Sequence, residues 1–119
     1  MAKNETVIVE FNNEQIKRKI KNGTSNAQKV LDSVVLADSN RFIPFKEGVL
    51  EKSGIIHTVI GSGYVVWKTP YAKAQYYGHP NKSHQKNPNA TMKWFETAKA
   101  RFKEKWIRMV ENEYRRNSE

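Results

Sequence analysis

Apolar and polar positions alternate at the start of the chain and then change to helical spacing. Residues 6–11, TVIVEF, alternate and are rich in β-branched side chains, which predicts a strand. Asn12 is suited to cap a helix that follows, and Gln15, three positions on, would complete a capping box. Ile16 and Ile20 lie four residues apart, as one face of this helix requires. The Asn-Gly-Thr triplet after it interrupts or ends the helix, because glycine is unfavourable in a helix interior.

A second helix is predicted to open at Thr24 or Ser25 and to stop near Arg41 or Phe42. Its end is set by Pro44, because the residue before a proline is pushed out of helical geometry. Apolar side chains recur at steps of three and four and form a stripe toward a core. The stripe consists of Ala27, Val30, Leu31, Val34 and Ala37.

The middle of the chain combines breaker residues with two apolar runs. Residues 41–54, RFIPFKEGVLEKSG, are predicted to form a loop. Gly48 is expected to have a positive φ there, where a β-branched residue is penalised. The runs 55–60, IIHTVI, and 64–69, YVVWKT, have the composition of strands. The Gly61-Ser62-Gly63 segment between them has the length of a three-residue loop, so the two runs are predicted to form a β-hairpin.

A short helix is predicted after the hairpin. Pro70 closes the second strand, and residues 71–78, YAKAQYYG, have the pattern of a helix that Gly78 ends at the C′ position. Residues 79–89, HPNKSHQKNPN, contain two prolines and no apolar side chain to pack. We expect them to form an exposed, mobile loop.

A long amphipathic helix is predicted from about Asn89 or Thr91 to Arg116. Trp94 lies beside its apolar stripe and is expected to be free for contacts, and the tail at residues 112–119 is expected to fray. The stripe consists of Phe95, Ala98, Phe102, Trp106, Met109 and Val110. The opposite face carries Lys93, Lys99, Arg101, Lys103, Lys105 and Arg108.

These elements predict an α+β fold in one domain that spans residues 1–119. The first strand and the hairpin form a small antiparallel sheet, and the amphipathic helices pack on one of its faces. The chain of 119 residues is long enough for one hydrophobic core and too short for two.

Positive charge is concentrated in the second half of the chain. The net charge is +9, and residues 62–119 contribute +7 of it, with 12 Lys and Arg against 5 Asp and Glu. A basic half is compatible with nucleic-acid affinity, with a solvated helix face or with docking on acidic neighbours. Because no known nucleic-acid motif is present, the last two interpretations are favoured. No long apolar run is present at the N-terminus, so neither a signal peptide nor a membrane span is expected.

Residues that could carry chemistry do not form a recognisable group. His57 is placed among apolar neighbours on a predicted strand, where an inert role is favoured over a catalytic one. His79 and His84 resemble half of a zinc site, but the chain has no cysteine and no second ligand pair is visible. No catalytic triad is recognisable either. The sequence therefore predicts a protein that is not an enzyme and has no cofactor or metal.

Aromatic side chains gather at residues 67–80, WKTPYAKAQYYGHP, which hold four of the 13 aromatic residues in the chain. Trp67 and Tyr76, with Ala72, are predicted to fill the core. Tyr77 is predicted to face a partner, because tyrosine often anchors protein contacts. That all four aromatic residues are core is an equally weighted alternative.

The order of motifs resembles minor capsid proteins of siphophages and prophages. FIP is followed by KEGVLEKSG, by VVWKTPYA at the end of the predicted hairpin and by QYYG. The resemblance runs from about Ser25 to Trp94 and weakly over the first strand, and the basic segment after Lys99 departs from it. The positions that match are Phe42, Pro44, Gly48, Leu50, Ser53, Trp67, Pro70, Tyr71, Ala72, Gln75, Tyr76, Gly78, Trp94, Ala98 and Lys99.

The resemblance implies a structural virion protein of the phage neck, similar to head–tail connector and tail-completion proteins. Such a protein would assemble in the host cytoplasm as a homo-oligomeric ring, sixfold or twelvefold, and would lie at the head–tail junction. Its partners would be other neck, connector and tail-tube proteins; DNA would pass without sequence-specific binding, and no membrane is involved. The alternative is a small basic nucleic-acid-binding accessory protein. The residues expected to contact partners are Tyr71, Gln75, Tyr77, His79 and Trp94.

Overall fold

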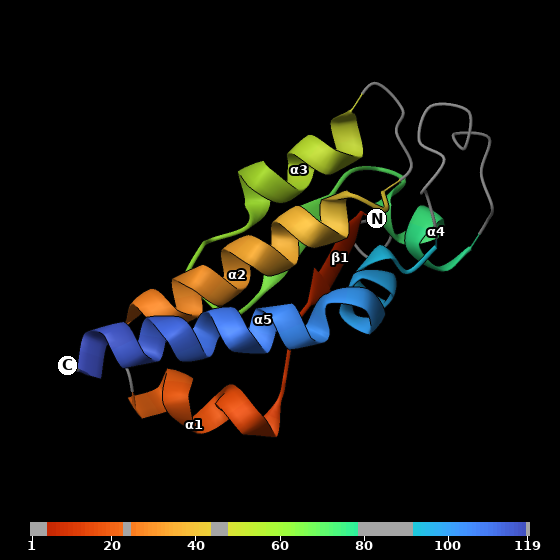
Figure 1. Cartoon of the computed structure of the whole chain (residues 1–119). Helices are drawn as coiled ribbons and strands as arrows, with labels where there is room; N and C mark the ends of the chain where they lie inside the picture. The colour runs from red at the N-terminus through yellow and green to blue at the C-terminus, as the bar shows by residue number, and fades with distance from the viewer. Residues whose placement is uncertain (1–4, 23–24, 44–47, 79–91, 119) are drawn as a thin grey trace.

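The computed structural model describes residues 5–22, 25–43, 48–78 and 92–118. Two strands and five helices lie in these ranges (Figure 1). In chain order they are β1 (Thr6–Val9), α1 (Glu14–Asn22), α2 (Ser25–Asn40), α3 (Val49–His57), β2 (Val65–Lys68), α4 (Ala72–Tyr77) and α5 (Trp94–Ser118).

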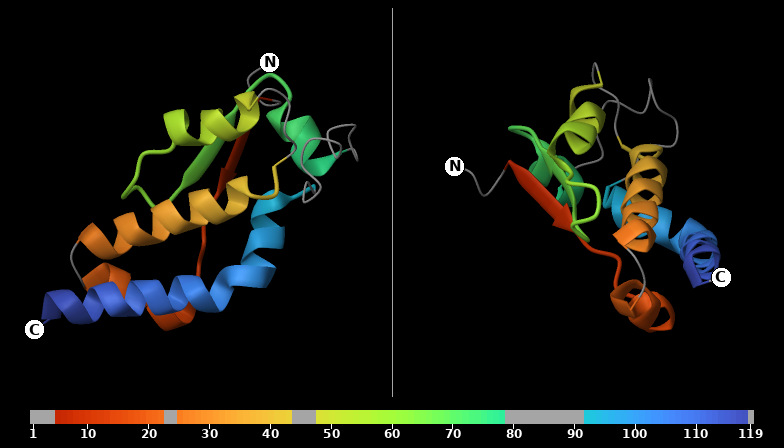
Figure 2. Two further views of the ribbon diagram at one scale, coloured as in Figure 1. Left: turned by 45° about the horizontal axis from the view of Figure 1, so that its top comes forward. Right: turned by 90° about the vertical axis from the view of Figure 1, so that its left-hand side faces the viewer.

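The two strands form an antiparallel sheet, and the helices pack against it, which confirms the α+β fold. Thr6 lies opposite Lys68 and Val9 opposite Val65. The helices α2 and α5 run side by side on one face of the strands, and α1 packs on α5 (Figures 1 and 2). The core therefore lies between the sheet and the α2–α5 pair.

The predicted hairpin is wrong, because the first three residues of its first strand belong to a helix and the other three form no strand. The segment predicted as a loop at 41–54 and a strand at 55–60 contains α3, and the sheet has β1 as the partner of β2. Leu50, Ser53 and Gly54 face inward at helical spacing. A Cβ on Gly54 would lie 2.7 Å from Cδ1 of Trp67. Close packing of α3 on the sheet thus overrides the β-branched composition of the run that follows.

Hydroxyl groups from the α3 segment replace a third strand at the outer edge of β2. The Lys68 N–H donates to Ser53 Oγ at 3.1 Å, and Ser53 Oγ donates to the Leu50 carbonyl at 2.6 Å. Thr58 Oγ1 accepts from the Val66 N–H at 2.9 Å and donates to the Val66 carbonyl at 3.3 Å. Two side chains therefore satisfy backbone groups that a hairpin strand would have bound.

A buried carboxylate on α2 holds the turn between α3 and β2. Asp32 Oδ2 accepts from the N–H groups of Gly61 at 2.7 Å and Gly63 at 3.0 Å. The φ angles of these glycines are 103° and 91°, which side-chain-bearing residues rarely adopt. Gln28 Nε2 donates to Asp32 Oδ1 at 2.8 Å. The Gly-Ser-Gly segment is thus a helix-to-strand turn that is fastened to α2.

Helix α1 begins one residue later than the predicted cap implies. Asn13 Oδ1, and not the Asn12 side chain, accepts from the Gln15 N–H at 2.9 Å. The expected face is confirmed, since Ile16 is buried and Ile20 is partly buried against the core. The N-cap was misplaced because two asparagines in a row offer the same signal.

Helix α2 covers the predicted range but buries a slightly different stripe. Ala27 and Leu31 are buried as expected, whereas Ala37 is exposed and Val35 and Leu36 are buried in its place. Two short polar side chains on the same face, Asp38 and Ser39, are also buried.

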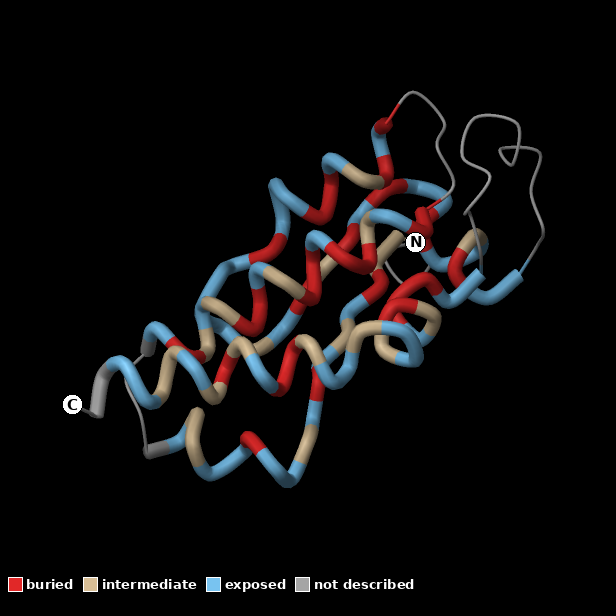
Figure 3. Tube along the Cα trace, viewed as in Figure 1, coloured by how far each residue is buried: buried red, intermediate tan, exposed pale blue. Residues whose placement is uncertain are grey.

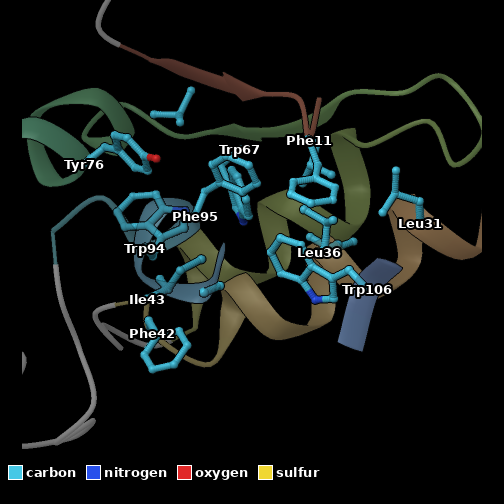
Figure 4. Close-up of a cluster of buried hydrophobic side chains, with 14 of the residues drawn as sticks. Phe11, Leu31, Leu36, Phe42, Ile43, Trp67, Tyr76, Trp94, Phe95 and Trp106 are labelled. Atoms are coloured by element: carbon cyan, nitrogen blue, oxygen red, sulfur yellow. The ribbon is translucent and has the colours of Figure 1, made fainter. Parts of the chain in front are cut away.

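Helix α5 begins at Trp94, and its first turn packs on α4 and the sheet. The ring of Trp94 is fully buried, with ring centroids 4.7 Å from Tyr76 and 5.8 Å from Trp67 (Figure 4). Further along, Trp106 packs edge-on against Phe11 at 5.1 Å. The expectation that Trp94 is free is wrong, because the helix is bounded here by α4 as well as by α2.

Two glycine predictions have different outcomes. Gly48 has φ 74° and precedes α3 as its N-cap, which confirms the positive φ. Gly78 does follow α4, but it is the C-cap with φ −106° and not a left-handed C′ residue. A Cβ there would meet the Ala74 carbonyl oxygen at 2.5 Å, so close approach explains this glycine. Pro44 and the predicted loop at 79–89 lie outside the described residues.

Candidate interaction surface

The largest group of exposed apolar side chains lies on α3 and the segment after it. Leu50, Ser53 and Gly54 face the core, whereas the apolar residues that follow them in the chain are exposed, as the burial colours along the Cα trace show (Figure 3). The exposed fractions are 64% for Ile55, 73% for Ile56, 69% for Val59 and 39% for Ile60. We call these four residues the α3 ridge. Contiguous exposed apolar side chains of this kind mark sites of association.

A groove of about 580 Å³ runs along β1, at the edge of the sheet that lies away from α3. Its walls come from β1 and the residue after it, from the end of α4 and from the start of α5. The Lys93 N–H donates to the Tyr76 carbonyl at 2.9 Å and ties these last two walls together. We call this the β1 groove, and it is lined by Ile8, Val9, Glu10, Tyr76, Tyr77, Lys93, Phe95 and Glu96.

The two tyrosines of the β1 groove occupy different environments. Tyr76 is buried, whereas Tyr77 is 57% exposed, and their ring centroids lie 4.9 Å apart. Burial raises the pKa of Tyr76 well above the ordinary tyrosine value, and the charge of Glu96 raises it further. The Tyr76 side chain that lines the groove is therefore uncharged, and the ring of Tyr77 is available to contact a bound partner.

The outer edge of β1 is open among the residues that the structure describes. Val66 and Lys68 direct their N–H groups away from β1, as their bonds to α3 hydroxyls show. Their partners across the sheet, Ile8 and Thr6, therefore direct their own backbone groups away from β2. An edge of this kind needs a cover, because its unpaired backbone groups can bind other chains.

Basic side chains gather on α1, and many of those on α5 are already engaged. Lys17, Arg18 and Lys21 are exposed on α1. On α5, Lys105 Nζ binds the buried Asp38 carboxylate at 3.0 Å, and the Trp106 indole N–H donates to the same carboxylate at 2.7 Å. Part of the predicted basic face of α5 therefore holds α5 to α2, through the bond between Lys105 and Asp38.

An ion pair joins α1 to α5. Lys19 Nζ lies 3.0 Å from Glu111 Oε2, and Gln15 Nε2 donates to the same oxygen at 3.4 Å. The hydrogen bond from Lys19 holds the pKa of the Glu111 carboxyl below its usual value, with a smaller contribution from Gln15.

Comparison with known families identifies the group to which the chain is related. The sequence matches the family described as minor capsid protein over residues 7–113, which extends from β1 into the last turns of α5. The chain belongs to the minor capsid protein family. No curated protein and no solved structure matches it at a significant level. The family gives this minor capsid protein a structural role in the phage virion, among other virion proteins.

Many of the motif residues of the minor capsid protein are brought together in its core, with Ala72, Trp94 and Ala98 among them. Phe42, Leu50, Trp67 and Tyr76 are buried, and Ser53 links α3 to β2. The Trp67 indole N–H also donates to Asn40 Oδ1 at 2.9 Å, at the end of α2. Their spacing in the sequence thus reflects how α2, α3 and the sheet pack.

The residues predicted to contact partners do not form a single site in the minor capsid protein. Tyr71 and Tyr77 are exposed and Gln75 is half-buried. Trp94 is part of the core, so it cannot contact a partner, and His79 lies outside the described residues. Of this set, Tyr77 is the one whose side chain lines the β1 groove.

Sequence reasoning missed the α3 ridge of the minor capsid protein. The signal was present in Ile55, Ile56, Val59 and Ile60, but a strand within a sheet would have buried much of this run. A helix with Gly54 on its inner face leaves the same side chains outside. The buried Asp32 and Asp38 were also missed, although both fall on or beside the apolar stripe of α2.

Other kinds of site receive no support from the described parts of the minor capsid protein. No described helix has both the length and the apolar character needed to cross a membrane. Among the residues in these ranges, no three His, Asp or Glu side chains are grouped so that they could hold a metal ion.

Proposed function

We propose that this minor capsid protein is a ring-forming subunit of the phage neck that joins the head to the tail. Its partners would be the portal–connector assembly on one side and tail proteins on the other. The observation that carries the proposal is the α3 ridge, since Ile55, Ile56 and Val59 are each more than 60% exposed. A subunit that worked alone would gain nothing from such a surface and would be prone to aggregate.

The construction of the surfaces supports a structural role. The α3 ridge is apolar, and the helix that carries Ile55 and Ile56 packs closely on the sheet through Gly54 and Trp67. The buried carboxylates Asp32 and Asp38 are engaged in hydrogen bonds that hold elements together. These two carboxylates thus help to fix the shape of the subunit.

The proposal is tested by removing the protein from an infection and locating it in particles. Without it, we expect filled or empty heads and complete tails to accumulate separately, and the wild-type protein supplied in trans to restore joined particles. A tagged copy should appear at the head–tail junction in electron micrographs. Normal joined particles without the protein, or a tag on the capsid shell or distal tail, would contradict the neck assignment.

A second candidate function is non-specific nucleic-acid binding, which the exposed Lys17, Arg18 and Lys21 of α1 favour. Phosphate contacts release counterions, so such binding falls steeply as salt is raised. The test is a fluorescence-anisotropy titration of duplex DNA at several salt concentrations. A neck subunit should bind only weakly near physiological salt, at the non-specific level of about 10⁻⁴ to 10⁻⁶ M. A tight, sequence-selective complex would favour the alternative.

A further inference from the structure

We propose that copies of this chain associate head to tail, with the α3 ridge of one subunit seated in the β1 groove of the next. This inference rests on the proposed ring and names the surfaces that build it. The occupant of the groove is a second copy of the chain, and four observations support this assignment.

The ridge and the groove lie at opposite edges of the same sheet. Helix α3 closes the outer edge of β2 through Ser53 and Thr58. The groove runs along β1, with Ile8 and Val9 in its wall, and includes no residue of β2 or α3. One contact of this kind therefore leaves a free ridge on one side of the pair and a free groove on the other, so that further copies can add.

The outer edge of β1 needs the kind of cover that α3 already gives to β2. Within one subunit, α3 and the residues after it lie against the edge of β2 and satisfy its backbone with side chains. The edge of β1 at Thr6 and Ile8 has no such cover in the described parts of the chain. The α3 segment of a neighbour would block this edge against pairing with other strands, since a covering helix is a common means of protecting an open strand. Its ridge residues are apolar, so it would act by covering the edge and not by hydrogen bonds like those of Ser53 and Thr58 to β2.

The two surfaces offer apolar side chains to each other. The ridge presents β-branched aliphatic side chains, and the groove presents the exposed rings and chains of Tyr77 and Ile8, at 57% and 59% exposure. Aromatic residues at a partly enclosed surface are typical anchors of protein contacts. Association would remove both sets of side chains from water.

Charge indicates that the occupant is another copy of this basic chain. The net charge of +9 makes most pairs of surfaces on two copies repel each other. Residues 49–64, which contain the ridge, carry one Glu and one Lys with a neutral His, so their balance is zero. The groove has Glu10 and Glu96 against Lys93, a balance of −1. These two surfaces can approach each other without like-charge repulsion, whereas α1, with four basic residues against Glu14, cannot meet a copy of itself.

Because the ridge and the groove differ, the contact is heterologous. A heterologous contact repeats from copy to copy and gives a closed ring when the rotation between neighbours closes. A contact between two identical patches would stop at a dimer. The geometry therefore predicts assembly beyond the dimer for the parent protein.

The test uses two substitutions in the purified full-length chain, one for each surface. Ile56→Glu places a charge on the ridge, and Tyr77→Glu places one in the groove. Both side chains are exposed, so each variant should keep the melting temperature of the parent within a few degrees. We expect the parent to form a species larger than a dimer by sedimentation velocity, and each variant alone to associate on the order of 30-fold more weakly, the loss typical of a contact anchor.

Mixing the two variants provides the decisive measurement. The Ile56→Glu copy keeps an intact groove and the Tyr77→Glu copy keeps an intact ridge, so a mixture contains one functional pair of surfaces. We expect one-to-one dimers that grow no further, seen by native mass spectrometry. Two control variants introduce the same charge elsewhere, Tyr71→Glu before α4 and Ala100→Glu on the exposed face of α5, and both should associate as the parent does.

Several results would overturn the inference. The parent could remain a monomer at high concentration, either interface variant could associate normally, or the mixture could stay monomeric. These outcomes differ from failure of the neck assignment, which is judged by where the protein lies in particles. If rings form through these surfaces but the protein lies elsewhere in the particle, the interface is supported and the assignment to the neck is refuted.

Discussion

Single residues in this protein are fixed by close approach and by backbone geometry more than by local composition. Gly54 is required by the Trp67 ring, Gly48 by a φ of 74° and Gly78 by the Ala74 carbonyl. Only the second of these requirements could be expected from the sequence, because a glycine beside helix-breaking neighbours suggests a positive φ. The other two depend on which residue of another element, or of a preceding turn, happens to lie next to the glycine.

Replacing Gly48 tests the importance of its left-handed backbone. Gly48→Val should lower the free energy of unfolding by at least about 1–2 kcal/mol, since a left-handed conformation penalises a side chain and β-branching adds to the penalty. The change is measured by urea denaturation. Gly48→Asn is the matched control, because asparagine tolerates this conformation better. Equal stabilities for the parent and the valine variant would show that the residue is free to change its φ.

The buried hydroxyl of Tyr76 should make stability depend on pH in the alkaline range. In the unfolded chain a tyrosine loses its proton near pH 10. In the folded chain the pKa of Tyr76 is raised by burial and by Glu96, so the proton is kept. The stabilising contribution is therefore complete below about pH 10 and is lost as pH rises toward the folded pKa.

Tyr76→Phe removes this titration and should flatten the fall in stability above about pH 10. The measurement is the free energy of unfolding of parent and variant from pH 8 to the highest pH at which both refold. Tyr64→Phe, at an exposed position, should keep the slope of the parent. An identical alkaline slope in the Tyr76→Phe protein would contradict the assignment to Tyr76.

Among the secondary-structure elements, periodicity predicted the helices well and failed in the middle of the chain. Helices α2 and α5 follow from their apolar stripes, because both bury one long face. The run at 55–60 could not be assigned from its own composition, since β-branched residues are typical of strands. Its structure is decided by the packing of Gly54 on Trp67 and by the hydrogen bonds of Thr58 to β2, which are contacts with another element of the fold.

The candidate site was predicted even less completely than the fold. Tyr77 was expected to face a partner, and its exposure is compatible with that role, which stays a prediction. The α3 ridge was not foreseen, because residues 55–60 were predicted as a strand. A strand within the sheet would have buried many of the side chains that the actual structure exposes. Trp94 was misplaced for a related reason: the first turn of a helix can pack on a different neighbour from the rest.

The edge contact between Thr58 and β2 can be tested by an isosteric substitution. Thr58→Val leaves the N–H and the carbonyl of Val66 without their side-chain partner at a partly buried position. We expect a loss of about 1–3 kcal/mol in the free energy of unfolding, the cost of unsatisfied buried polar groups. Thr6→Val makes the same chemical change at a partly exposed position of β1 and should be nearly neutral. A neutral Thr58→Val would show that Val66 finds other partners.

At the scale of the whole molecule, the protein has exposed apolar side chains at the two sheet edges and basic side chains on α1. The structure is elongated, with extents of 49 × 29 × 22 Å, and α1 packs on both α5 and α2 at the opposite side of the molecule from α3 (Figures 1 and 2). Such a division of surfaces is suited to a subunit that meets neighbours on defined sides. It also separates the residues that stabilise the subunit from those that we propose to connect it.

The adjacent Tyr76 and Tyr77 allow folding and assembly to be separated in the virion. Tyr76→Ala removes a buried ring and should cost about 3–5 kcal/mol, so the subunit itself should fail to fold stably. Tyr77→Ala removes an exposed ring, and its loss of contact with Tyr76 should cost no more than about 0.5–1.5 kcal/mol. The Tyr77→Ala subunit should stay folded and be incorporated poorly into particles.

The measurements are thermal melts of both variants and a complementation assay that counts joined particles. Normal incorporation of the Tyr77→Ala subunit, or its unfolding at ordinary temperature, would show that Tyr77 belongs to the core alone. The Tyr71→Ala variant, at an exposed position outside the groove, indicates how much any exposed tyrosine contributes.

The pairing of β1 with β2 also has a consequence for the order of events as the chain is made. Thr6 pairs with Lys68, 62 positions later, so the first strand must wait for much of the chain before it has a partner. Closing so long a loop is slow compared with forming a local helix such as α2. The wall of the β1 groove that comes from α5 is synthesised later still. The ridge can therefore form before the groove is complete, so assembly through the proposed ridge–groove contact has to wait until synthesis has passed the start of α5.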